Sequence, residues 1–222
     1  MLIHKNNNFI GLLIGLLVLI FTTPLLHLFD EKIAQFILHL AIIGMMIITI
    51  IGNQGNRQWY RSIIILSIIE VIIFLLAILL NEMLLTHIAI SLLLIFLITS
   101  IAVAFSSVFF SQEITINQLV GASCIYLLLG IVWAILYTNL YYFDVESFKG
   151  LGGMSAKMRF QDFMYFSFVT LSTLGYGDIT PVTQFAKTLA FMQAVVGQLY
   201  LTIMVAGLVG KAINSRSPST SD

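Results

Sequence analysis

The chain has 222 residues, of which 59% are hydrophobic and only 9% are charged. A soluble domain has about a quarter of its residues charged, so this composition excludes a soluble protein and predicts an integral membrane protein surrounded by lipid. Ten basic and ten acidic residues leave no net charge, which argues against a nucleic-acid partner.

Six apolar segments approach or exceed the roughly 20 residues that a helix needs to cross a bilayer. They cover residues 9–29, 33–52, 62–81, 85–108, 119–142 and 185–210. The apolar run of the first segment is longer than the roughly 7–15 residues of a secretory leader, so we expect a retained anchor. The predicted fold class is therefore an all-α integral membrane protein with six transmembrane helices.

The segment between the fifth and sixth helices differs from the other polar breaks. It contains QDFMYFSFVTLST, which is long enough to enter the bilayer as a helix but too short to cross it. The residues that follow, TLGYGD, would then be non-helical backbone at membrane depth. Such backbone is tolerated only where protein buries it or where it lines water. The sequence therefore predicts a re-entrant pore helix and a loop that lines an aqueous path.

This loop can offer a permeant ion neutral oxygen ligands. Before Asp178 it has backbone carbonyls and the Thr173 hydroxyl, which are hard ligands suited to an alkali cation. Gly175 and Gly177 alternate with residues that carry side chains, and glycine adopts a positive φ without steric cost. Successive carbonyls can therefore turn toward one axis. The C-terminus of the short helix adds a partial negative charge, so both features favour a cation.

The stretch STLGYGDITP resembles the selectivity-filter signature of potassium channels, and the order of helix, pore helix, filter and helix resembles their pore module. The resemblance implies that the carbonyls of Thr173, Leu174, Gly175 and Tyr176 replace the hydration shell of K⁺, with Gly177 completing the outer end. Because one chain supplies one filter strand, the family likeness also implies a homotetramer.

Further residues acquire possible roles from this resemblance. Tyr165 and Phe166 match aromatic residues that brace the filter from behind, with interfacial anchoring as the alternative. Gly197 matches a gating-hinge glycine, with a helix-packing contact as the alternative. Asp178 is expected to brace the outer mouth through hydrogen bonds. Leu174 stands where valine or isoleucine is commoner, and a non-selective monovalent cation channel is therefore the second functional hypothesis.

The predicted domains are a four-helix transmembrane domain over 1–117, a pore domain over 118–212 and a disordered tail over 213–222. The first lies where voltage-gated channels have their sensor, but its fourth helix contains no lysine or arginine. Steep voltage gating moves about three or four charges per subunit, so we expect no strong voltage dependence.

Glu70, in the middle of the third helix, is an intramembrane acid and by default a candidate functional residue. A structural, protonated glutamate near Thr99 and Ser100 is the favoured interpretation, and a pH- or ligand-sensing role is the alternative.

An enzyme is the rival hypothesis from another class, because GAS at residues 121–123 faintly resembles intramembrane serine proteases. A nucleophilic serine needs an adjacent base, and no histidine follows His87 in the sequence. We therefore expect no enzyme and no cofactor beyond K⁺ as the permeant ion. Lysine and arginine divide equally between the two sides, so charge bias does not orient the chain. The family likeness implies a multi-pass protein of the bacterial plasma (inner) membrane with both termini cytoplasmic.

Overall fold

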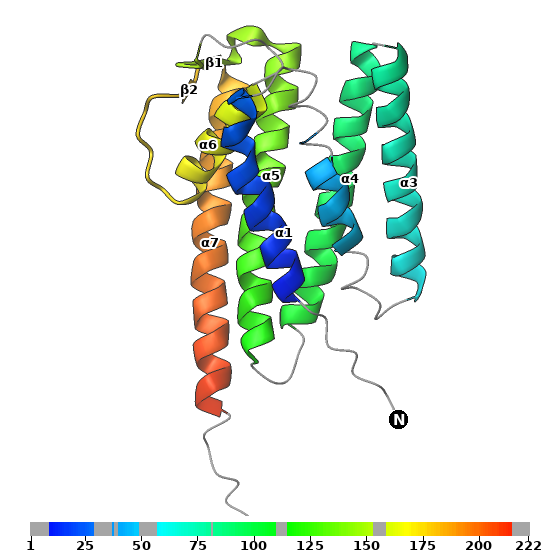
Figure 1. Ribbon diagram of the computed structural model, residues 1–222. Coiled ribbons are helices and arrows are strands. Elements are labelled where there is room, and N and C mark those ends of the chain that lie inside the picture. Colours follow the sequence, from blue (N-terminus) through cyan, green and yellow to red (C-terminus); the bar gives the residue numbers. More distant parts are fainter. Residues whose placement is uncertain are drawn as a thin grey trace, which may run out of the picture.

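The computed structural model describes residues 9–28, 37, 40–48, 57–80, 82–109, 115–152 and 159–214. Within these ranges the chain is a helical bundle with two very short strands (Figure 1). Its helices are α1 (Phe9–Thr22), α3 (Arg57–Leu80), α4 (Met83–Phe109), α5 (Ile116–Phe143), α6 (Arg159–Leu171) and α7 (Gln184–Asn214), with 3₁₀ turns η1 (Thr23–Leu28) and η2 (Val145–Ser147). The strands are β1 (Phe148–Lys149) and β2 (Thr180–Pro181).

Four of the described helices are long and apolar enough to cross a membrane, and they correspond to the predicted third, fourth, fifth and sixth spans. Their apolar portions are Ile63–Leu80, Leu84–Phe109, Ile116–Phe143 and Gln184–Gly207. The all-α membrane class is therefore confirmed, whereas six spans are not shown.

The first predicted span, 9–29, is helical over residues 9–28 but changes its helix type on the way. Helix α1 has 14 residues and tightens into the 3₁₀ turn η1 at Thr23. Pro24 has no backbone N–H to continue the α-helical pattern, and the Thr23 hydroxyl donates to the Leu19 carbonyl (2.7 Å). The second predicted span, 33–52, lies largely outside the described residues, and its described part at 40–48 is helical.

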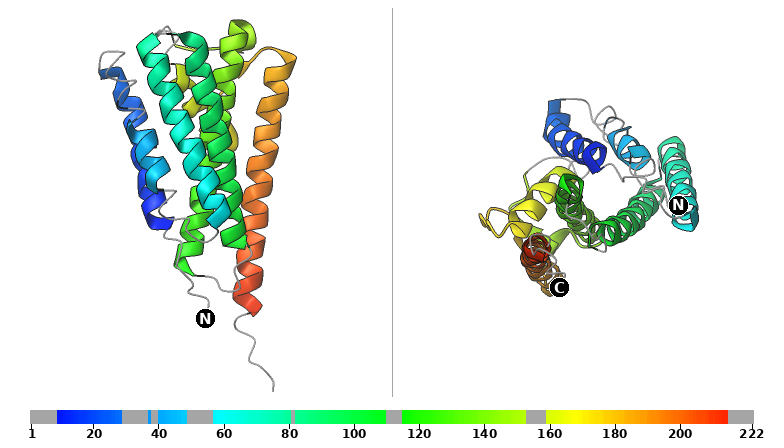
Figure 2. Two further views of the ribbon diagram at one scale, coloured as in Figure 1. Left: turned by 90° about the vertical axis from the view of Figure 1, so that its right-hand side faces the viewer. Right: turned by 90° about the horizontal axis from the view of Figure 1, so that it is seen from below.

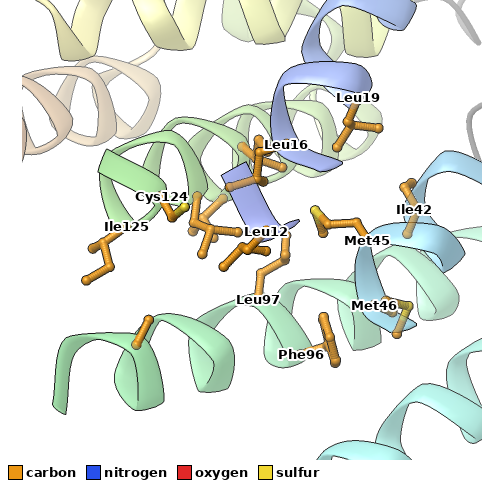
Figure 3. Packing of buried hydrophobic residues seen from close by; sticks show 14 of the residues in the cluster. Leu12, Leu16, Leu19, Ile42, Met45, Met46, Phe96, Leu97, Cys124 and Ile125 are labelled. Carbon is orange, nitrogen blue, oxygen red and sulfur yellow. The ribbon is translucent and has the colours of Figure 1, made fainter. Parts of the chain in front are cut away.

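The long helices lie in a row in which each packs against its neighbour. Helix α3 packs along α4, α4 along α5, and α5 against both α6 and α7, while α1 lies along α5 (Figure 2). Apolar side chains from α1, 40–48, α4 and α5 meet in one core, which includes Leu16, Met45, Phe96 and Ile125 (Figure 3). Helices α1 and α4 are therefore anchored directly on α5, and α3 reaches it through α4.

Candidate functional site

The predicted re-entrant helix is α6, which spans Arg159–Leu171 and is followed by irregular backbone. Two hydrogen bonds close its end: the Leu174 N–H donates to the Val169 carbonyl (3.0 Å) and the Thr173 N–H donates to the Thr170 carbonyl (3.0 Å). This pair of bonds around one left-handed residue is a Schellman motif. The helix therefore stops at a defined residue, and Thr173 is the first residue of the loop backbone.

Backbone handedness alternates along this loop. Thr173, Gly175 and Gly177 have φ values of 63°, 56° and 79°. The positive φ expected at the two glycines is observed. Thr173 was not foreseen, because a β-branched residue rarely adopts a positive φ and the strain costs on the order of 1–3 kcal/mol. Glycine would adopt this φ without strain, but threonine also provides a hydroxyl group at the start of the loop.

The loop has little cover from its own chain. Residues 172–178 are all exposed, and the two large apolar side chains among them, Leu174 and Tyr176, are 60% and 67% exposed. Figure 1 shows the loop beside α6 and α7, standing away from the other helices. The loop is therefore open to contact from outside its own chain.

The outer end of the loop is tied to α6 by a hydrogen bond. The Tyr165 hydroxyl donates to Asp178 Oδ2 (2.6 Å), and Asp178 Oδ1 accepts from the Ile179 N–H (3.0 Å). The bond from Tyr165 is the main cause that lowers the pKa of the Asp178 carboxyl. The same bond raises the pKa of Tyr165 to about 12. The Tyr165 ring also stacks near the Tyr176 ring, with centroids 6.5 Å apart.

Phe166 has different neighbours from Tyr165, although the two residues are adjacent. Its ring is buried and meets the rings of Tyr137 and Phe148 at centroid distances of 5.0 and 5.6 Å. Phe166 therefore packs α6 against α5, and Tyr165 is the aromatic residue that contacts the loop.

A second attachment of the outer mouth was missed by sequence reasoning. Strand β1 pairs antiparallel with β2, so that Lys149 lies opposite Thr180. Gly150, with φ at 82°, follows β1 so closely that an added Cβ would lie 1.7 Å from the Asp178 carbonyl oxygen. Only glycine fits there. In the sequence, only the presence of a glycine at position 150 could have indicated a close backbone contact, and no feature identified Asp178 as the residue contacted.

A buried polar network behind α6 was also missed. The Tyr137 hydroxyl donates to Gln193 Oε1 (2.6 Å), and Gln193 Nε2 donates to the Ser167 carbonyl (2.9 Å) and hydroxyl (2.7 Å). The Ser167 hydroxyl donates in turn to the Gly130 carbonyl (2.6 Å). The side chains of Tyr137, Ser167 and Gln193 are fully buried. A glutamine in the middle of an apolar helix was the available signal.

Gly197 lies against the end of α6. A Cβ added at Gly197 would lie 2.7 Å from the Leu171 carbonyl oxygen and 2.8 Å from Leu171 Cδ1. Such close approach of two helices is what a small residue permits. The structure therefore gives Gly197 a packing contact, and its hinge role stays a prediction.

Two further candidates lie away from the loop. Glu70 is buried on α3 with 3% exposure. The hydroxyls of Thr99 and Ser100, which the sequence suggested as its partners, donate to the Phe96 carbonyl (2.8 Å each). Ser123 is exposed, and its hydroxyl donates to the Leu119 carbonyl of its own helix (3.1 Å).

Comparison with known proteins agrees with this arrangement. Residues 122–214 match the family model described as "Ion channel". The chain is 29% identical over 99 residues to two-pore potassium channel 5 of Arabidopsis thaliana, covering 45% of this chain and 22% of that protein. It is 40% identical over 53 residues to two pore potassium channel c of Oryza sativa subsp. japonica, covering 24% of this chain and 12% of that protein.

These matches span no more than about a fifth of the curated relatives' length. No solved structure matches the chain. The matched segment 122–214 contains most of α5 and all of α6, the loop and α7. The chain is therefore a multi-pass membrane protein whose segment 122–214 is similar to an ion-channel pore domain.

Proposed function

We propose that the chain forms a homotetrameric channel that conducts K⁺ passively and selectively. The observation that carries this proposal is the alternation of positive φ at Thr173, Gly175 and Gly177, directly after the C-terminus of α6. Alternating handedness turns successive carbonyls in one direction, and rings of carbonyls replace the hydration shell of K⁺ in potassium channels. The ligands are the carbonyls of Thr173, Leu174, Gly175 and Tyr176.

Four copies are required because a single strand cannot surround an ion. Each copy has an exposed apolar face that neighbouring copies can cover. This face is formed by Leu174 and Tyr176 of the loop and by Phe191, Val195 and Leu199 of α7. The printed names of the two relatives, both potassium channels, support K⁺ as the ion. We place the channel in the plasma membrane with both termini cytoplasmic.

Helices α1 to α4 are proposed to form a supporting domain without strong voltage gating. Helix α4 contains no lysine or arginine between Met83 and Phe109, so it has no gating charge to move. It also packs directly along α5, which suits a fixed scaffold.

The test is the reversal potential of the purified protein in a planar bilayer with K⁺ on one side and Na⁺ on the other. A value near the K⁺ limit is expected, with conduction lost in Gly175→Ala. Within the described part of the chain, a Cβ added at Gly175 meets no atom within 4 Å beyond its two neighbours, so within one copy the substitution acts through the positive φ of 56°. Gly152→Ala is the matched control, because Gly152 has no positive φ and open space around it.

A reversal potential near zero with clear single-channel currents would refute K⁺ selectivity. It would favour the second candidate, a non-selective monovalent cation channel, whose specific observation is Leu174 in place of the commoner valine or isoleucine.

A further inference from the structure

The Gln193 amide occupies the centre of the buried network that joins α5, α6 and α7. Its oxygen accepts from the Tyr137 hydroxyl, and its nitrogen donates both protons to Ser167. The backbone carbonyl of Ser167 can only accept, so the amide nitrogen must face it and the amide orientation is fixed. An amide buried in an apolar bundle is costly unless it is hydrogen-bonded, and here every donor has a partner.

The contacts of α7 with α6 have a regular spacing. Gln193 and Gly197 are one turn apart on α7, and Ser167 and Leu171 are one turn apart on α6. Gln193 binds the Ser167 carbonyl, and Gly197 abuts the Leu171 carbonyl. The two helices therefore meet at two successive turns and run in the same direction there.

This register determines where the loop begins relative to α7. Leu171 is the last residue of α6, and the first left-handed residue, Thr173, follows two positions later. The Gly197 contact sets only how closely the helices approach. The hydrogen bonds of Gln193 are directional, so they oppose sliding or rotation of α6 along α7.

We propose that Gln193 is a positioning residue for the filter. Its amide locks the turn of α6 that carries Ser167 onto α7, and so holds the carbonyls that begin at Thr173 at the spacing that K⁺ requires. The Tyr137 hydroxyl donates to the amide oxygen, so this oxygen is not left unsatisfied in the apolar bundle. This inference rests on the proposed function, because it assigns Gln193 a role in the affinity of the same filter for K⁺.

The test compares the full-length tetramer with the variant Gln193→Met, which has a similar length and no amide. The K⁺ concentration that gives half-maximal thermal stabilisation is measured, together with the Na⁺/K⁺ permeability ratio in bilayers. The variant loses both hydrogen bonds from Gln193 to Ser167. We expect the K⁺ midpoint to rise about tenfold and the permeability ratio to rise with it.

Two variants separate positioning from simple stabilisation. Tyr137→Phe removes the bond to Gln193 Oε1 but leaves both bonds to Ser167, so it should lower the melting temperature while raising the K⁺ midpoint by less than about threefold. Gln184→Met makes the same substitution at an exposed position of α7 and should change neither quantity.

The proposal is overturned if Gln193→Met lowers the melting temperature but leaves the K⁺ midpoint and the permeability ratio at wild-type values. If Gln193→Met does not assemble, Ser167→Ala replaces it, since this variant loses only the hydroxyl and keeps the carbonyl acceptor. A raised K⁺ midpoint in Ser167→Ala supports the proposal and an unchanged one overturns it. A wild-type channel without K⁺ selectivity would instead refute the proposed function.

Discussion

Replacing Gly197 by alanine distinguishes the two roles that the sequence left open for this residue. The added Cβ would lie 2.7 Å from the Leu171 carbonyl oxygen, well inside ordinary van der Waals contact, and the atom it meets is backbone rather than the end of a flexible side chain. To relieve the overlap, the last turn of α6 must move, and the loop that starts two residues later must move with it.

The magnitude follows from comparison with a second glycine of the same helix. Gly207→Ala introduces a Cβ that would lie 3.9 Å from Phe109 Cε1, which is ordinary van der Waals contact. Both substitutions gain the same helix propensity, about 1 kcal/mol, so that gain cancels in the difference. The difference in the free energy of unfolding between the two variants is then the cost of overpacking, about 1–3 kcal/mol. Gly197→Ala should be less stable than Gly207→Ala by this amount.

The assay is thermal unfolding of the purified protein in saturating K⁺, with single-channel recording of the same preparations. Packing predicts lower stability and altered conduction for Gly197→Ala and neither for Gly207→Ala. If Gly197→Ala is as stable as Gly207→Ala and differs from wild type only in how often the channel opens, the packing argument is refuted and the hinge role is favoured.

The other predictions concern the outer mouth and the buried acid. Gly150→Ala should abolish assembly of a conducting filter, because its Cβ would overlap the Asp178 carbonyl oxygen; normal current from this variant would contradict the contact. The hydrogen bond from Tyr165 lowers the pKa of Asp178. Its contribution to the stability of the folded loop is therefore complete above the ordinary carboxyl pKa and is lost as the pH falls through the lowered pKa. Tyr165→Phe should therefore shift the acid limb of the current to higher pH, and an unshifted limb in current–pH titrations would count against the bond. Glu70→Gln should leave current and its pH dependence unchanged if the acid is structural, whereas loss of a pH response would indicate sensing.

The loop was largely predictable from the sequence because its requirements are local. A helix too short to cross the bilayer and two alternating glycines follow from residue count and steric freedom alone. Thr173 could not be predicted in the same way. Its positive φ arises from the Schellman motif that ends α6, and a β-branched residue at that position contradicts its own conformational preference.

The attachments of the loop were not predictable because their partners lie far apart in the chain. Gly150 meets Asp178 across 28 positions, and Gln193 meets Ser167 across 26. A left-handed glycine or a mid-helix glutamine indicates that a contact exists without naming the partner. In the first span, hydropathy predicted the helical segment but not the change from α-helix to 3₁₀ helix at Thr23.

Strain at Thr173 is retained because the structure fixes both ends of the loop. At the inner end, Gln193 and Gly197 hold the last turns of α6 against α7. At the outer end, Asp178 is held by the Tyr165 hydroxyl and by the close approach of Gly150. A strained backbone conformation persists only where surrounding contacts hold it in place. The contacts at the two ends of the loop therefore determine its geometry more than its own residues do. Helix α5 carries Gly130 and Tyr137 of the buried network and also packs against α1 and α4, so movements of those two helices would be transmitted through α5 to the contacts that hold the loop.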